Sequence, residues 1–187
     1  MGHSALFIFP TGIRDQKAAM NDDRIHKKKL ILDTSAILSR RVSLMQGNVA
    51  TTTSVLDEIR LGKIARYTGF SSDMMDILAP GKESLAAARE AAEATGDLHE
   101  LSRTDLDVIA LCLDLNGILV TDDYAMQNVA SRLGLEFMGA DLKPIDRDIK
   151  WQYRCTGCGK IFQQHVEICP VCGHQTKRAV RSYKKRQ

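Results

Sequence analysis

The sequence predicts an α/β fold, in which helices flank a parallel β-sheet, followed by a small C-terminal unit organised around cysteines. Two observations lead to this prediction. Between residues 30 and 138, short apolar runs of strand length alternate with longer helical patterns, an order typical of parallel sheets covered by helices. Near the C-terminus, four of the five cysteines fall in two Cys-x-x-Cys pairs. The 187 residues are enough for one ordinary domain and a small appendage.

The strands are predicted from apolar or β-branched runs that end beside polar residues. Leu30–Leu32 and Ile118–Val120 have the continuous apolar character of buried parallel strands, and each is followed directly by polar residues. Val49–Thr53 and Leu135–Met138 are predicted as two further strands. These four segments are separated by lengths of chain that can hold a crossover helix, as parallel pairing requires.

The helices are predicted from their capping residues and apolar faces. Ser54, followed three residues later by an acid, is expected to cap a helix that runs to about Tyr67. The helix that starts at Ser102 is apolar on nearly every side, so it is expected to be central and to end at Gly117. Two more helices are predicted, Lys82–Ala94 closed by Gly96 and a helix after Asp123 that reaches Leu133 and is closed by Gly134.

The composition excludes several classes of protein. Apolar residues make up 44% of the chain, which supports a packed core and argues against wholesale disorder. No apolar run approaches the roughly 18 residues that a membrane span needs, so a cytoplasmic protein without a membrane partner is expected. The expected organisation is a flexible extension at 1–27, a main domain at 28–142, a linker at 143–149, a cysteine unit at 150–177 and a basic tail at 178–187.

The charge is divided unevenly along the chain. Residues 150–187 hold nine Lys or Arg and one acid, a net charge of +8, whereas the other 149 residues hold 17 basic and 22 acidic side chains, a net charge of −5. An acidic body with a basic appendage indicates that the appendage meets a polyanion. The alternative is that the basic residues only keep the tail solvated.

The cysteine pattern indicates a structural zinc site. Cys155, Cys158, Cys169 and Cys172 have the spacing Cys-x2-Cys-x10-Cys-x2-Cys, and four thiolates satisfy the tetrahedral coordination of zinc. The ten-residue spacer suits a short hairpin, so a zinc ribbon is predicted. Free thiols, a redox pair and ligation by His165 or His174 fit the pattern less well. A unit this small depends on the metal for its folding.

Acidic residues follow the predicted strands or begin the predicted helices. Ligands of an open parallel sheet bind outside the carboxyl ends of its strands, and carboxylates that converge there repel one another unless a cation joins them. Each acid could also be only a helix cap. The spacing therefore leaves two interpretations open, a site for a hard divalent cation or ordinary caps, for Asp33, Glu58, Asp105, Asp122 and Asp123.

Four ordered segments resemble those of PIN-domain ribonucleases. They are Leu32–Ala36, Val55–Ile59, Leu101–Asp105 with Val108–Leu111, and Val120–Tyr124. The resemblance covers about residues 29–140. With the cysteine unit and the run from Asp122 to Asn128, the chain after the extension at 1–27 is similar to archaeal members of the Nin-one-binding protein family, which cut precursor small-subunit rRNA to form its mature 3′ end.

The resemblance implies a PIN-like sheet and a metal-dependent endoribonuclease. Asp33, Glu58, Asp105 and either Asp122 or Asp123 are then expected to bind Mn²⁺ or Mg²⁺. The general Thr-x-Asp pattern selects Asp123, whereas Asp122 stands directly at the strand end, so both stay open. Hydrolysis of the phosphodiester would leave a 3′-hydroxyl and a 5′-phosphate, without a histidine or serine triad.

The resemblance also implies partners. RNA is the expected substrate, in the setting of the small ribosomal subunit precursor and its assembly factors, and DNA is not expected. The ribbon and the basic tail are expected to bind the RNA backbone, with Trp151 or Tyr153 stacking on a base; the alternative for Trp151 is packing against the ribbon. The expected RNA-binding residues are Trp151, Arg178, Arg181, Lys184, Lys185 and Arg186.

Two other functions are compatible with parts of the sequence. One is a PIN-type toxin that cuts tRNA or mRNA, although such toxins are usually bare PIN domains without a ribbon. The other is an RNA-binding assembly factor that kept the fold and lost catalysis, although all the acids of the motif are present.

Overall fold

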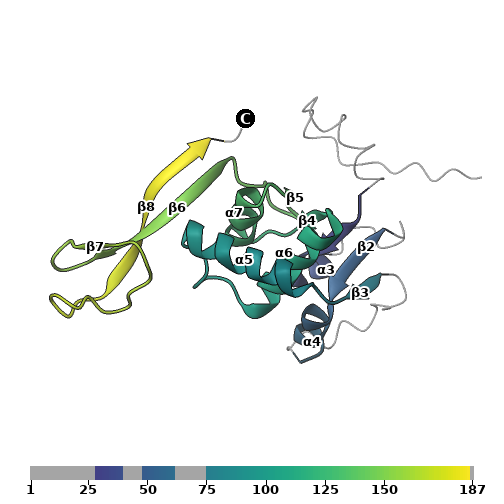
Figure 1. Cartoon of the computed structure of the whole chain (residues 1–187), viewed down its shortest axis with the longest axis horizontal. Coiled ribbons are helices and arrows are strands. Elements are labelled where there is room, and N and C mark those ends of the chain that lie inside the picture. Colours follow the sequence, from purple (N-terminus) through teal and green to yellow (C-terminus); the bar gives the residue numbers. More distant parts are fainter. Residues whose placement is uncertain (1–27, 40–47, 62–74, 186–187) are drawn as a thin grey trace, which may run out of the picture.

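The computed structural model describes residues 28–39, 48–61 and 75–185. The extension expected at 1–27 and the predicted RNA-binding residue Arg186 lie outside these ranges. The main body is a parallel sheet with the strand order β3-β2-β1-β4-β5 (Figure 1). Its strands are β1 (Leu30–Leu32), β2 (Val49–Thr52), β3 (Asp76–Leu78), β4 (Ile118–Val120) and β5 (Glu136–Met138).

The centre of the sheet confirms the predicted buried strands. Every residue of β1, β2 and β4 is buried, and β1 pairs with β2 on one side and β4 on the other. Because all the pairs are parallel, Asp33 after β1 and Asp122 after β4 leave the sheet at one edge. The edge strand β3 was not predicted, since its three residues are exposed and lack an apolar pattern.

Five described helices surround this sheet: α3 (Thr34–Ser39), α4 (Thr53–Leu61), α5 (Lys82–Thr95), α6 (Arg103–Leu115) and α7 (Tyr124–Arg132). Helix α6 is central, as predicted, and packs against α4, α5, α7 and the strands β1, β2 and β4. Leu106, Val108, Ile109 and Leu111 are almost fully buried in it. Within the described ranges, none of the helices has both the length and the apolar character that a membrane crossing requires.

The helix caps agree with the sequence in part. Gly96 closes α5 at a φ of 81°, as expected of a left-handed cap. The α6 cap is Asn116, at a φ of 45°, and not Gly117. Asparagine tolerates this conformation because its short side chain bonds locally. Gly117 has a packing role, since a Cβ there would lie 2.6 Å from the carbonyl oxygen of Lys29.

The start of α4 also differs from the prediction. The Thr52 hydroxyl, one position before the helix, accepts a hydrogen bond from the Val55 N–H at 3.4 Å. Ser54, predicted as the cap, lies inside the helix and donates to the Asp107 carboxylate at 2.9 Å. The reason is that α4 follows β2 without an intervening loop, so the last strand residue is already at the cap position. The helix is described as far as Leu61, and its predicted end near Tyr67 lies outside the described residues.

The C-terminal unit is a three-stranded antiparallel sheet that extends away from the main body (Figure 1). Its strands are β6 (Arg147–Cys155), β7 (Ile161–Phe162) and β8 (Thr176–Lys185), with β6 in the middle. The pairing of β6 with β8 runs through two of the predicted boundaries. Residues 147–149 of the predicted linker and residues 178–185 of the predicted basic tail lie in this hairpin, where Arg147 pairs with Lys185.

Polar contacts fasten the hairpin to the body. The Asn128 side chain, on α7, pairs with both backbone groups of Ile149, at 2.7 Å and 2.8 Å, and donates to Asp97 at 2.6 Å. The Arg178 guanidinium forms ion pairs with Asp97 and with Glu100. Because Asn128 and Asp97 are both buried, these contacts are shielded from water and fix the hairpin on α5 and α7.

Candidate functional site

The end of β4 and the end of β1 are joined by a buried threonine. The Thr121 hydroxyl donates to the Asp33 carboxylate and accepts a hydrogen bond from the Asp123 N–H at 3.0 Å. Thr121 is fully buried, so this bridge is protected from solvent. It was not predicted as a site residue, although the Thr-x-Asp pattern contained the signal.

Asp33 lies at the deepest point of this edge, with 5% of its surface exposed. The Ser35 hydroxyl lies 3.0 Å from both carboxylate oxygens, and the Ala36 N–H donates at 2.6 Å, which caps α3. Burial raises the pKa of Asp33, the hydrogen bonds from Thr121, Ala36 and Ser35 oppose the rise, and the charge on Asp105 adds to it. Asp33 therefore caps α3, and its negative charge is disfavoured by burial and by the neighbouring Asp105.

Asp105 is placed by the capping box that the sequence predicts. Its carboxylate accepts from the Ser102 N–H at 2.8 Å, and its own N–H donates to the Ser102 hydroxyl at 3.1 Å. Burial raises the pKa of Asp105, hydrogen bonding of its carboxylate to the backbone and the side chain of Ser102 lowers it, and the charges of Asp123 and Glu58 raise it further. The cap and the acidic cluster are thus compatible, because one carboxylate serves in both.

Glu58 belongs to the exposed side of the cluster. It lies in α4, and its carboxylate accepts a hydrogen bond from the Thr34 hydroxyl of α3 at 2.9 Å. Its charge acts on Asp105. Asp105 therefore interacts electrostatically with three other acids. They are Asp33, Glu58 and Asp123.

The two acids after β4 have different surroundings. The Asp122 carboxylate accepts hydrogen bonds from the N–H groups of Ala140, Asp141 and Leu142, at 2.8–3.1 Å. Asp123 caps α7, accepting from Ala125 at 2.7 Å and from Met126 at 3.4 Å. Only Asp123 of this pair is among the charges that raise the pKa of Asp105. Asp122 therefore anchors the chain after β5, and Asp123 belongs to the cluster.

The donor set at this edge is made of carboxylate and hydroxyl oxygens, which are the ligands that hard divalent cations prefer. Among the described residues, the acids do not close into a group of three whose ligand atoms all lie within 4.8 Å of one another. Two of them have raised pKa values caused partly by neighbouring carboxylates. A divalent cation would remove this repulsion, so the residues fit such an ion chemically.

The four cysteines converge as predicted and could bind a zinc ion. Their sulfur atoms all lie within 4.8 Å of one another, with 3.3 Å between Cys155 and Cys172 and 3.7 Å between Cys158 and Cys169. A tetrahedron with Zn–S bonds of about 2.3 Å requires sulfur atoms roughly 3.8 Å apart. The packing around the first pair is tight, because a Cβ on Gly157 would lie 2.6 Å from the His174 ring.

The predicted RNA-binding residues separate into two groups. Arg178 lies over the Trp151 ring, 4.2 Å from its centroid, while it pairs with Asp97 and Glu100. Trp151 also packs on α5, since a Cβ on Gly96 would lie 3.1 Å from its own. Both side chains are therefore engaged within the protein. The exposed basic residues of the hairpin are Arg181, Lys184 and Lys185, which the sequence predicted, and Arg147, Lys150, Arg154 and Lys177, which it did not.

Removing Arg178 is expected to destabilise the protein. Arg178→Ala leaves the carboxylate of Asp97, which is 1% exposed, without its ion-pair partner. An uncompensated buried charge of this kind costs about 3–5 kcal/mol of unfolding free energy. Urea denaturation of the zinc-loaded protein measures this loss. Arg181→Ala, in the same strand but exposed, is the matched control and should change stability by less than about 0.5 kcal/mol.

Of these two variants, Arg181→Ala should have the larger effect on RNA affinity. Arg181→Ala is expected to weaken RNA binding and to reduce the slope of log affinity against log salt by about one phosphate contact. A stability loss for Arg181→Ala, together with an unchanged stability of Arg178→Ala, would contradict these assignments.

Asp33→Asn is expected to stabilise the metal-free protein at neutral pH. The unfolded Asp33 releases its proton near the ordinary pKa of 3.8, and the folded one at a higher pH. Between those two pH values the folded state holds more protons, so the stability that Asp33 contributes falls as pH rises and stays low above the folded pKa. Removing the charge should raise the unfolding free energy at pH 7 by about 1 kcal/mol.

This gain can be measured by urea denaturation at pH 7 and at low pH, with Glu90→Gln, an exposed change on α5, as the control. The gain should shrink at low pH, where the wild-type carboxyl is already neutral. An Asp33→Asn protein that loses stability equally at both pH values would contradict the raised pKa.

Comparison with known proteins agrees with this geometry. Residues 30–115 match the model of the PIN domain of ribonuclease. The chain is 46% identical to the protein named Ribonuclease VapC1 of Thermoplasma acidophilum, over 79% of this chain and 76% of the relative. It is 38% identical to Endoribonuclease Nob1 of Methanocaldococcus jannaschii, over 81% and 77%, and 39% identical to Endoribonuclease Nob1 of Pyrococcus abyssi, over 81% and 93%.

These matches agree with the α/β body and the four-cysteine cluster of the structure. Two relatives that are matched over most of their own length are named as ribonucleases. The chain is therefore an endoribonuclease that belongs to the Nob1 family of PIN-domain nucleases.

Proposed function

We propose that this endoribonuclease cleaves precursor small-subunit rRNA to form its mature 3′ end, and that Mn²⁺ or Mg²⁺ bound by Asp33, Glu58, Asp105 and Asp123 is its catalytic metal. The observation that carries the proposal is the set of electrostatically linked acids at the carboxyl edge of the sheet. Family membership supports the choice of RNA. The small ribosomal subunit precursor and its assembly factors are the proposed partners.

The acids differ in how they are held. Hydrogen bonds from Ser35 and Thr121 fix the orientation of Asp33, and the capping box fixes Asp105. Asp123 is held at the first turn of α7. Glu58 is exposed, so its side chain can adjust its approach. Three rigid carboxylates and one adaptable carboxylate form a site that can accept a cation and a phosphodiester together.

A bound divalent cation supplies an acidified water and neutralises charge on the phosphate under attack. The protein's part is to place that water in line with the scissile bond and to hold the RNA against the acidic edge. Because the acids would repel the RNA backbone, the attraction must come from elsewhere. The exposed basic residues of the β6–β8 hairpin, among them Arg154, Lys177 and Arg181, are proposed to supply it.

Zinc is the proposed occupant of the cysteine cluster. Four thiolates select zinc over hard cations, and the cluster closes the end of the β6–β8 hairpin through Cys155, directly at the end of β6. The zinc is structural, because all four of its coordination positions are filled by protein ligands.

The proposal is tested with an RNA that spans the 3′ end of small-subunit rRNA, incubated with the zinc-loaded protein and Mn²⁺. One cut at the mature 3′ end is expected, with a 3′-hydroxyl on the upstream product and a 5′-phosphate on the downstream one. Asp33→Asn serves as the inactive control. Cleavage at unrelated positions, or an Asp33→Asn protein that cuts as fast as wild type, would show that the assignment is wrong.

A toxin-type ribonuclease is the second candidate, favoured by the relative named Ribonuclease VapC1. The ribbon argues against it, since its hairpin is fastened to α5 and α7 by buried contacts. Incubation with a mixture of tRNA, mRNA and precursor rRNA separates the two. Preferential loss of tRNA or mRNA, and growth arrest on expression, would favour the toxin.

A further inference from the structure

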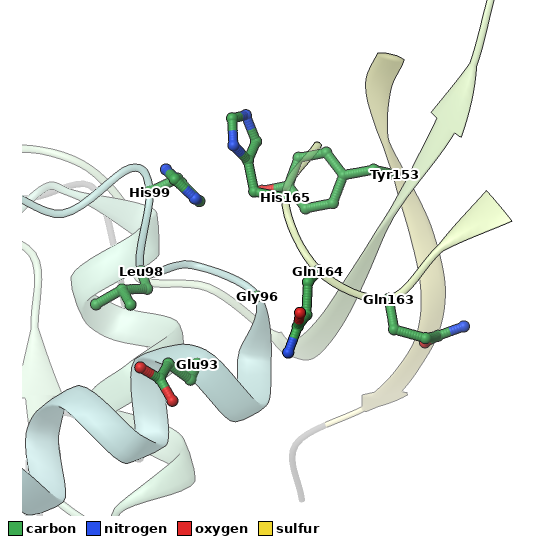
Figure 2. A pocket seen from close by; sticks show the side chains of 8 residues that line it. All are labelled: Glu93, Gly96, Leu98, His99, Tyr153, Gln163, Gln164 and His165. Atoms are coloured by element: carbon green, nitrogen blue, oxygen red, sulfur yellow. The ribbon is translucent and has the colours of Figure 1, made fainter. Parts of the chain in front are cut away.

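A cavity of about 320 Å³ lies where the ribbon meets the main body. One wall is the end of α5 with the turn that follows it, and the other is the loop after β7, as Figure 2 shows. The proposed catalytic acids and the zinc cysteines are not among the residues that line it. Its walls come from segments about 65 residues apart in the chain, and it exists only while the two units are docked.

Aromatic and imidazole rings form the upper part of the cavity. The His99 and His165 rings are in contact, with their centroids 3.7 Å apart and their planes tilted by 42°, and Tyr153 meets His165 edge to face at 4.9 Å (Figure 2). Tyr153 is 5% exposed, and its buried hydroxyl has no hydrogen-bond partner among the described residues. The exposed rings of the cavity lining are therefore those of His99 and His165.

The lower part is polar. Gln164 points from the ribbon loop toward the end of α5, and Glu93 lies on that helix (Figure 2). Gln164 offers both a donor and an acceptor, and Glu93 offers acceptors. The lining contains one carboxylate and neither Lys nor Arg within the described structure. This charge disfavours a phosphate and favours the edge of a nucleobase, whose amino and ring N–H groups can donate to a carboxylate.

We propose that this cavity binds one unpaired nucleobase of the RNA substrate, and this inference rests on the proposed function. Single-stranded RNA is recognised by splaying bases onto aromatic or histidine rings and hydrogen-bonding their edges. The exposed rings of His99 and His165, with Tyr153 packed against His165, supply the first kind of contact, and Gln164 and Glu93 supply the second. Because the cavity spans both units, a base held there fixes the RNA against the ribbon and the nuclease body together.

The test measures RNA binding by the zinc-loaded Asp33→Asn protein, which leaves the RNA intact. A set of precursor RNAs is used, each with one abasic nucleotide in a single-stranded position. One position should weaken binding by about 5–150-fold, since a stacked base contributes about 1–3 kcal/mol. Adding Gln164→Ala or His165→Ala should remove most of the penalty at that position and leave the others unchanged.

Gln175→Ala is the matched control, an exposed glutamine of the same ribbon that does not line the cavity. It should keep the abasic profile of the parent protein, and zinc content confirms that each variant is folded. If no abasic position loses its penalty in Gln164→Ala or in His165→Ala, the cavity is not a base site. Nucleoside monophosphates serve as a second arm, and competition by them below millimolar concentration would assign the cavity to free nucleotides instead of RNA.

The two proposals fail differently. A normal cut at the mature 3′ end, together with abasic penalties that Gln164→Ala and His165→Ala leave unchanged, would overturn the nucleobase site alone. The opposite result is an abasic penalty that disappears in Gln164→Ala, together with a wild-type protein that leaves precursor rRNA uncut. That result would overturn the rRNA assignment and keep the base site.

Discussion

Asp123→Asn is expected to lose at least about 100-fold in cleavage rate, whereas Asp122→Asn keeps activity within a few-fold of wild type. The loss follows because ligand removal weakens a metal interaction that supplies several kcal/mol to phosphodiester cleavage. Asparagine caps a helix as well as aspartate does, so α7 should form in the Asp123→Asn protein. The measurement is the single-turnover rate on precursor RNA with Mn²⁺.

Asp122→Asn is the matched partner, because the two residues are adjacent and differ in what they contact. In the described structure, the Asp122 carboxylate accepts hydrogen bonds from the backbone N–H groups of residues 140–142, and an amide oxygen can still accept from some of these groups. Its cost should be about 1 kcal/mol of unfolding free energy. Loss of activity in Asp122→Asn with full activity in Asp123→Asn would reverse the assignment.

Removal of zinc is expected to unfold the ribbon while the parallel sheet remains folded. A unit this small cannot bury enough apolar surface to fold without its metal, and structural zinc contributes about 10–16 kcal/mol to the folding of such units. Trp151, the one tryptophan of the chain, lies between the hairpin and α5. A chelator, or Cys158→Ser, should therefore shift its fluorescence and weaken RNA binding.

The control for this prediction is Cys112→Ala. Cys112 is fully buried in α6, and burial raises the pKa of its thiol to about 12, so it is not a metal ligand. This variant should release as much zinc as wild type on unfolding. A ribbon whose tryptophan fluorescence and RNA affinity survive chelation would show that the cysteines are not the source of its folding.

Much of the architecture could be predicted because buried parallel strands have a distinct pattern. β1 and β4 are continuous apolar runs, and the central position of α6 follows from apolar residues on all its sides. The edge strand β3 could not be predicted, since exposed strand residues carry no apolar alternation. The cysteine cluster could be predicted from spacing alone, because few arrangements other than a metal site bring four thiols together.

The acids could be predicted as a group, but their individual roles could not. Sequence places Asp122 and Asp123 side by side, and only the fold shows that the chain after β5 returns to Asp122. The roles of the individual basic residues could not be predicted either. Arg178 looked like part of a tail because its partner Asp97 is 81 positions away, so its ion pair depends on tertiary contacts that composition does not reveal.

The central claim is that one cluster, formed by Asp33, Glu58, Asp105 and Asp123, holds the catalytic cation. Titration calorimetry of the zinc-loaded protein with Mn²⁺ tests it most directly, with Asp33→Asn, Asp123→Asn and Asp122→Asn beside wild type. The account predicts binding to wild type and to Asp122→Asn, and binding at least about tenfold weaker in the other two. Equal Mn²⁺ affinity in all four proteins, or a loss confined to Asp122→Asn, would contradict it.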